Sequence, residues 1–121
     1  MVKALFDTNI LVDYLRGVDE ARIELARYQD PAISVISWIE VVVGATPATE
    51  EAMRAFLNGF RVIALDEGVA EAAASLRRTH RMKLRDAIIW ASAAREGRLL
   101  VTRDKKAFPA SDPGVRLPYK S

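Results

Sequence analysis

Short apolar segments with strand character recur along the chain, and helical patterns separate them. These segments are rich in valine, isoleucine, leucine and phenylalanine and cover residues 2–6, 32–36, 60–65 and 99–102. Between them, apolar residues recur at the three- to four-residue spacing of an amphipathic helix. Such alternation of strand and helix favours an α/β fold with a mainly parallel sheet of four or five strands and helices on both faces.

Helix-start and helix-stop residues indicate where the helices lie. Asp66 is a typical N-cap and Gly97 a typical C-terminal stop, and Ser37 with Glu40 has the spacing of a capping box. We therefore expect helices over residues 10–15, 19–28, 37–43, 50–57, 67–78 and 86–96, and an edge strand over 115–117. At 121 residues, half of them hydrophobic, we expect a single domain over 1–121.

The composition excludes several kinds of chemistry. The chain has no cysteine, so disulfides, thiolate catalysis and zinc bound by sulfur are excluded. His80 is the only histidine, which excludes a ribonuclease that uses two imidazoles as acid and base. Glu40 interrupts the longest apolar run, 33–43, and no signal peptide is visible. We expect a soluble, cytoplasmic protein that does not enter a membrane.

Positive charge is concentrated in one segment. The formal net charge is only +2, but residues 77–106 contain ten lysines and arginines and three acids. A basic segment of this kind is suited to a polyanion such as RNA, although a solvated helix face would also explain it. Arg85, Arg103 and Lys105 flank acidic residues, and we predict that they contact RNA.

Four acids lie where strands end or helices begin, namely Asp7, Glu40, Asp86 and Asp104. Each has a structural explanation of its own as a helix cap, a charge at a helix N-terminus or a turn residue. In a parallel sheet, however, all four would lie on the same rim, where ligands bind. Carboxylates held close together repel one another unless a cation lies between them. Oxygen ligands favour Mg²⁺ or Mn²⁺, with one or two ions activating water at a phosphate.

Four segments, taken in order, resemble the PIN-domain ribonucleases and most closely the VapC-type toxins of toxin–antitoxin pairs. The segments are LFDTNIL at 5–11, SWIEV at 37–41, LRDAIIWASA at 84–93 and LLVTRDKKAF at 99–108. The resemblance implies a PIN-like three-layer α/β/α fold and an endoribonuclease, dependent on Mg²⁺ or Mn²⁺, that cuts single-stranded or loop RNA. It also implies a homodimer and a cognate antitoxin that blocks the acidic pocket.

The resemblance assigns roles to individual residues. Asp7, Glu40, Asp86 and Asp104 match the metal-binding acids of the family, and Thr8, Asn9 and Thr102 match residues that orient those acids. An RNA-processing PIN nuclease remains an alternative to a toxin. Two other classes fit less well, because a dehalogenase-like phosphatase requires an acid where Asn9 stands. A phospho-acceptor receiver domain requires adjacent acids after the first strand, which this chain also lacks.

Overall fold

The structure is a computed structural model that describes residues 1–120. Within them the chain forms six helices and one five-stranded sheet. The elements in order are β1 (Ala4–Phe6), α1 (Thr8–Leu15), α2 (Asp19–Ala26), β2 (Ala32–Ser34), α3 (Val35–Val43), α4 (Glu50–Leu57), β3 (Arg61–Ile63), α5 (Glu67–His80), α6 (Leu84–Arg95), β4 (Leu99–Val101) and β5 (Val115–Arg116). The predicted α/β class is confirmed.

The sheet is parallel throughout, with the strand order β3-β2-β1-β4-β5. Leu5 of β1 lies opposite Ala32 on one side and Leu100 on the other, which places β1 at the centre. The chain moves outward from β1 in one direction to β2 and β3 and then returns to β4 on its other side. This reversal creates a crevice at the carboxyl ends of β1 and β4.

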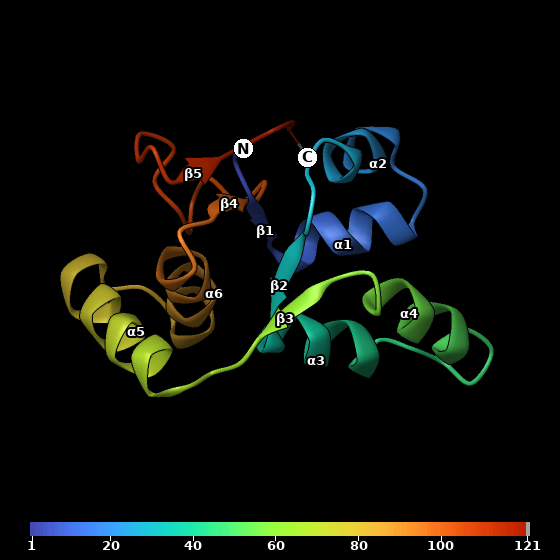
Figure 1. Cartoon of the computed structure of the whole chain (residues 1–121), viewed down its shortest axis with the longest axis horizontal. Helices are drawn as coiled ribbons and strands as arrows, with labels where there is room; N and C mark the ends of the chain where they lie inside the picture. The colour runs from blue at the N-terminus through green and yellow to red at the C-terminus, as the bar shows by residue number, and fades with distance from the viewer. Residues whose placement is uncertain (121) are drawn as a thin grey trace.

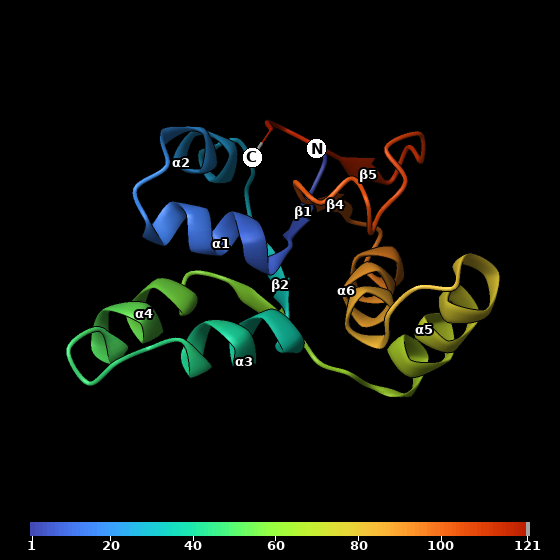
Figure 2. The same ribbon diagram turned by 180° about the vertical axis from the view of Figure 1, so that it is seen from behind.

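Helices cover both faces of the sheet, as predicted. Figures 1 and 2 show α5 and α6 on one side of the strands and α1 to α4 on the other. One core packs α5 and α6 against residues such as Leu5 and Leu100. The other packs α1 to α4 against Phe6 and Val101, which follow those two residues in the chain and face the opposite way. Both faces of the strands are therefore buried, which explains their uninterrupted apolar sequences.

The expected start of the helix that contains Glu40 is wrong, and other helix ends differ from the expected ones by one or two residues. The second strand ends at Ser34 rather than Ile36, and α3 begins at once with Ser34 as its N-cap, accepting a hydrogen bond from the Ile36 amide at 3.1 Å. Ser37 is therefore not a cap, and Glu40 lies in the middle of α3 rather than at its start. The β-branched residues of this segment favour a strand by propensity, which made the second strand look longer than it is. Ser34, rather than Ser37, accepts the hydrogen bond from a free amide at the start of α3.

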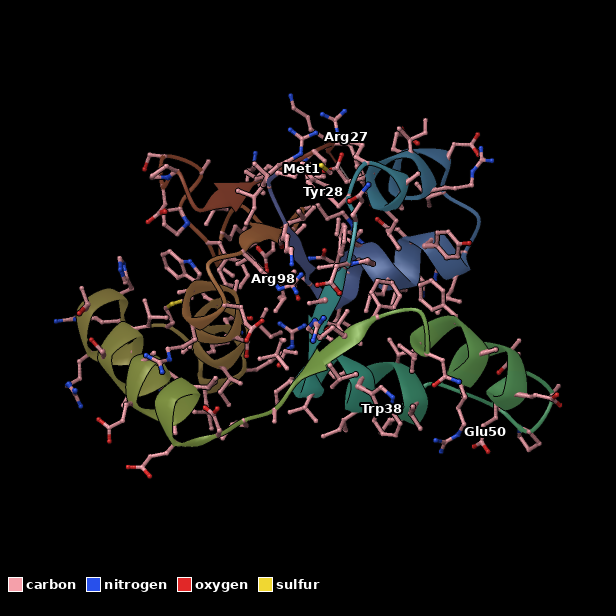
Figure 3. The ribbon with its side chains drawn as sticks, viewed as in Figure 1. Met1, Arg27, Tyr28, Trp38, Glu50 and Arg98 are labelled. Carbon is pink, nitrogen blue, oxygen red and sulfur yellow. The ribbon has the colours of Figure 1, made fainter. Side chains whose placement is uncertain are left out.

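The end of the sheet where β1 begins is held together by a buried arginine. Arg98 donates to the carbonyl oxygens of Ala4 at 3.2 Å and Asp30 at 2.6 Å, and to the Asp30 carboxylate at 3.1 Å. Figure 3 shows Arg98 near the middle of the molecule, below Met1, Arg27 and Tyr28. The acids predicted to bind metal follow the opposite ends of the strands, so the two ends of the sheet have separate roles. In residues 1–120, no helix combines the length and apolar character needed to cross a membrane.

Candidate active site

Asp7 follows β1 directly and is almost fully buried, with 1% of its surface exposed. One of its oxygens, Oδ1, accepts from its neighbour's amide, Thr8 N, at 2.7 Å, so Asp7 is the N-cap of α1. Its other oxygen, Oδ2, accepts from the Thr102 hydroxyl at 2.9 Å and from Asn9 Nδ2 at 3.4 Å. Asp7 can therefore cap α1 and also serve as a ligand of the site, because its hydrogen bonds hold the carboxylate in one orientation.

Glu40 comes from α3 and meets the beginning of α1. The Thr8 hydroxyl lies 2.6 Å from Glu40 Oε1 and 2.8 Å from the hydroxyl of Ser37. Ser37 is fully buried one helical turn before Glu40, on the same side of α3. Sequence reasoning missed its contact with Thr8, because a serine three residues before a glutamate is typical of a helix cap.

Three of the predicted acids meet at one guanidinium group, that of Arg85. Its Nη2 lies 3.1 Å from Asp7 Oδ1, its Nε lies 2.7 Å from Glu40 Oε2, and its Nη1 lies 2.7 Å from Asp86 Oδ1. Asp86 stands in the first turn of α6, as predicted. The acids thus converge from β1, α3 and α6, although they are up to 79 positions apart in the sequence.

Burial and Arg85 act in opposite directions on these carboxylates. Burial raises the pKa of Asp7 above its ordinary value, and the positive charge of Arg85 with hydrogen bonds from Thr102 and Thr8 offsets only part of this effect. For Glu40, burial would also raise the pKa, but the hydrogen bonds from Arg85 and Thr8 outweigh it and lower the pKa. Positive charge close to Asp7 therefore favours the ionised form of its buried carboxylate.

Asp104 stands apart from the other three acids. Its Oδ1 accepts from the backbone amides of Lys106 and Ala107, both at 3.1 Å, which is the turn role considered for it in the sequence. Its own amide donates to the Thr102 hydroxyl at 3.1 Å, and Thr102 in turn donates to Asp7. Asp104 is therefore linked to the site through Thr102, and its side chain is exposed.

The chemistry of the donors fits a hard divalent cation, but Arg85 occupies the space between them. One cationic group, the Arg85 guanidinium, contacts Asp7, Glu40 and Asp86 at once. In residues 1–120, however, no three acidic or histidine side chains lie close enough to form a ready-made metal site. The guanidinium separates the carboxylates by roughly its own width.

A basic hollow adjoins Asp86 and Asp104. It has a volume of about 380 Å³, and its charged lining consists of His80, Arg81, Lys83 and Lys106 with those two acids. His80 lies at the end of α5 with its ring 5.2 Å from that of Trp90. Four side chains that carry or can carry positive charge therefore lie beside the acids, in the segment whose sequence indicated a polyanion.

The residues predicted to contact RNA have different surroundings. Arg85 points at the three acids, and Arg103 is held by Asp13 through two contacts of 2.7 and 3.2 Å. Nothing in the sequence indicated this pairing. Asp13 also accepts from the Tyr119 hydroxyl at 2.8 Å. Lys105 is exposed.

Comparisons with known proteins agree with this architecture. The family model described as the PIN domain matches residues 4–111. The chain is 36% identical over 113 residues to Ribonuclease VapC10 from Mycobacterium tuberculosis, an alignment covering 87% of this chain and 85% of that protein.

Solved structures show the same fold. A toxin-antitoxin complex from Klebsiella pneumoniae contains a chain with a TM-score of 0.92 and 42% identity, covering 98% of this chain and 99% of that one. FitAcB from Neisseria gonorrhoeae contains one with a TM-score of 0.77 and 26% identity, covering 95% and 97%.

Proposed function

The chain belongs to the PIN-domain family, and on that basis we propose that it is an endoribonuclease acting as the toxin of a toxin–antitoxin pair. One observation supports this most strongly: Asp7, Glu40 and Asp86 hold a single cationic group at the carboxyl ends of the parallel strands. The similarity to a protein named as a ribonuclease, and to a chain in a toxin-antitoxin complex, supports the proposal. Family membership also removes the phosphatase and receiver-domain alternatives.

We propose Mg²⁺ or Mn²⁺ as the cofactor, held by Asp7, Glu40 and Asp86, with Asp104 at the edge of the site. A bound ion of this kind lowers the pKa of a water ligand and offsets negative charge on a phosphodiester. Thr8 and Thr102 hold the carboxylates of Glu40 and Asp7 in place through their hydroxyls. Hydrogen bonds of this kind keep metal-binding oxygens oriented when no metal is bound.

Single-stranded RNA fits the basic hollow beside the acids. Lys83, Arg81 and Lys106 supply charge for backbone phosphates next to Asp86 and Asp104. Lys105 and Arg103 extend this positive surface beyond the hollow. An RNA strand that follows these side chains would pass Asp86 and Asp104, which would bring a phosphodiester close to the proposed metal ligands.

We propose that an antitoxin covers the groove between α1, α3 and α4. The groove has a volume of about 310 Å³ and includes Val12, Leu15, Val41 and Met53, with Glu40 at its rim. A protein segment in this groove would therefore reach a carboxylate of the active site. We also infer one domain over 1–121, since β5 lies beyond the range matched by the family model and still pairs with β4. A homodimer is part of the proposal.

Cleavage by an Asp7→Asn variant tests the function. Wild-type protein should degrade single-stranded RNA with Mn²⁺ or Mg²⁺, and chelator should stop it. Asp7→Asn should lose at least about 100-fold in rate while keeping the wild-type circular dichroism spectrum, since asparagine preserves the N-cap. Asp66→Asn, which changes the N-cap of α5 outside the site, is the matched control. Equal cleavage by wild type and Asp7→Asn would contradict the proposal.

Growth of cells that express the protein separates a toxin from an RNA-processing nuclease. Induction of the wild-type chain should arrest growth, and induction of Asp7→Asn should not. A chain that cleaves RNA in vitro but leaves growth unchanged would favour the RNA-processing alternative. Co-expression of the small partner that co-purifies with the toxin should restore growth.

A further inference from the structure

We propose that Arg85 is a built-in competitor of the metal ion, so that a divalent cation binds Asp7, Glu40 and Asp86 only when the Arg85 guanidinium leaves them. This inference rests on the proposed metal-dependent function. It concerns the resting state of the site, where the chain supplies its own cation. It predicts that Arg85 weakens metal binding, although it stabilises the protein without metal.

The contacts of Arg85 differ from those of the other arginine–carboxylate pairs. Arg103 and Arg116 each make two contacts with a single acid, Asp13 and Glu24 respectively. Arg85 instead uses three different nitrogens on three different carboxylates. The donors of a guanidinium lie in one plane at fixed angles, so its carbon must lie between the three acids. An ion that bound all three carboxylates would have to lie in this same region, with the carboxylates drawn in toward it.

A divalent ion and the guanidinium cannot share this position. Both are cations, and at a separation of a few ångströms in a partly buried site their repulsion is only weakly screened. Each carboxylate oxygen that faces Arg85 would also have to turn toward the metal. Asp7 Oδ2 is held by Thr102 and Asn9, whereas Oδ1 accepts from the Thr8 amide and is the oxygen that Arg85 contacts.

Arg85 can leave without breaking the fold. Its side chain is 38% exposed, and it stands at the second residue of α6, next to the open basic hollow. In the described part of the chain, its side-chain hydrogen bonds all go to the three acids. Moving the side chain toward solvent therefore leaves behind only the charges that the metal would neutralise.

If Arg85 organised the metal site instead of competing with the metal, its removal would have the opposite effect on metal binding. If Arg85 stayed in place and organised the acids for a metal bound beside it, removing Arg85 would weaken metal binding. If Arg85 competes with the metal, removing it strengthens binding. A neighbouring charge commonly changes the binding of a single proton by about one to three pKa units, so we expect at least about a tenfold effect on a divalent ion.

Calorimetric titration of the full chain with Mn²⁺ alone tests whether removing Arg85 strengthens or weakens metal binding. Arg85→Gln should bind Mn²⁺ at least about tenfold more tightly than wild type. Arg116→Gln is the control, because it breaks the arginine–carboxylate pair of β5 with Glu24, which is not one of the three acids, and should leave the Mn²⁺ affinity unchanged. Thermal unfolding gives a second readout: in chelator Arg85→Gln should melt below wild type, and saturating Mn²⁺ should raise its midpoint more than that of wild type.

Each outcome decides a different question. Equal or weaker Mn²⁺ binding by Arg85→Gln, with measurable binding by wild type, would overturn the competitor role and leave the metal site standing. Binding by neither protein would overturn the metal site and the competitor role with it. If Arg85→Gln does not fold in chelator, Arg85→Lys replaces it, since lysine keeps the charge but lacks the planar set of donors that reaches the three carboxylates at fixed angles. Its affinity should then lie above that of wild type, and an affinity at or below wild type would contradict the inference.

Discussion

The Thr8 hydroxyl lies 2.6 Å from Glu40 Oε1 and joins the first residue of α1 to the middle of α3. A carboxylate can only accept a hydrogen bond, so the proton belongs to Thr8. The threonine therefore orients one oxygen of Glu40 while Arg85 holds the other. The position of Glu40 relative to Asp7 depends on this bond, because Thr8 follows Asp7 directly in the chain.

Thr8→Val should weaken Mn²⁺ binding about 10- to 100-fold, the usual effect of losing a residue that orients a metal ligand. Valine has nearly the shape of threonine but cannot donate to Glu40. Thr8→Ser should restore most of the affinity, and Thr79→Val, on the exposed side of α5, should have no effect. Calorimetric titration with Mn²⁺ measures the change. Unaltered affinity in Thr8→Val would show that Glu40 needs no support from α1.

Lys83→Gln combined with Lys106→Gln should weaken the binding of single-stranded RNA and reduce its dependence on salt. Both side chains line the basic hollow beside Asp86. Loss of two phosphate contacts should lower the slope of log affinity against log salt by about 1.4. Fluorescence anisotropy with labelled RNA in chelator measures this without cleavage. Lys3→Gln, at the opposite end of the sheet, is the control, and an equal effect there would contradict a localised RNA site.

Glu24→Gln should make the stability less dependent on pH in the acid range. Burial would raise the pKa of Glu24, but hydrogen bonds from Arg116 and Tyr28 outweigh burial and lower it. A lowered folded-state pKa means that the stabilisation is complete above the unfolded value near 4.5 and is lost as pH falls through the folded value.

Urea unfolding between pH 6 and pH 3 measures this effect. The difference in unfolding free energy between wild type and Glu24→Gln should be about 2 kcal/mol at pH 6 and should shrink toward pH 3. Glu51→Gln changes an exposed acid and serves as the control. A difference that stays constant over this range would show that Glu24 does not carry the pH dependence.

Arg98→Met should lower the free energy of unfolding by about 2–4 kcal/mol, because the carbonyl oxygens of Ala4 and Asp30 lose their donor. Methionine fills similar space without any hydrogen-bond donor. Arg78→Met, on an exposed position of α5, should cost little. Chemical unfolding at neutral pH gives both values. Metal binding should persist in folded Arg98→Met, since Arg98 lies at the other end of the sheet from the acids.

Much of the fold follows from local patterns in the sequence. The apolar strands, the N-cap at Asp66 and the stop at Gly97, whose φ is 64°, all lie where the pattern indicates. The boundary near Ser34 could not be predicted, because the residues from Val35 to Val43 favour a strand by propensity. Packing of α3 against β2 and α1 overrides that preference.

Which residues belong to the candidate site could be predicted more easily than which residues they contact. Asp7 and Asp86 are recognisable because an acid at a strand end or helix start can be located from spacing alone. Asp13 gave no such signal, since its partners Arg103 and Tyr119 are 90 and 106 positions away. Arg85 was expected to contact RNA because it stands next to Asp86 in the sequence.

By itself, the sequence determined which segments become strands and helices and which residue types the site contains, because hydrophobic periodicity and turn chemistry act over only a few residues. Only the tertiary structure decided that Arg85 lies against Asp7, Glu40 and Asp86, and that Asp104 is linked to them through Thr102. Those contacts depend on the order of the strands in the sheet. The strand order brings together groups up to 95 positions apart, and no local pattern specifies such a distance.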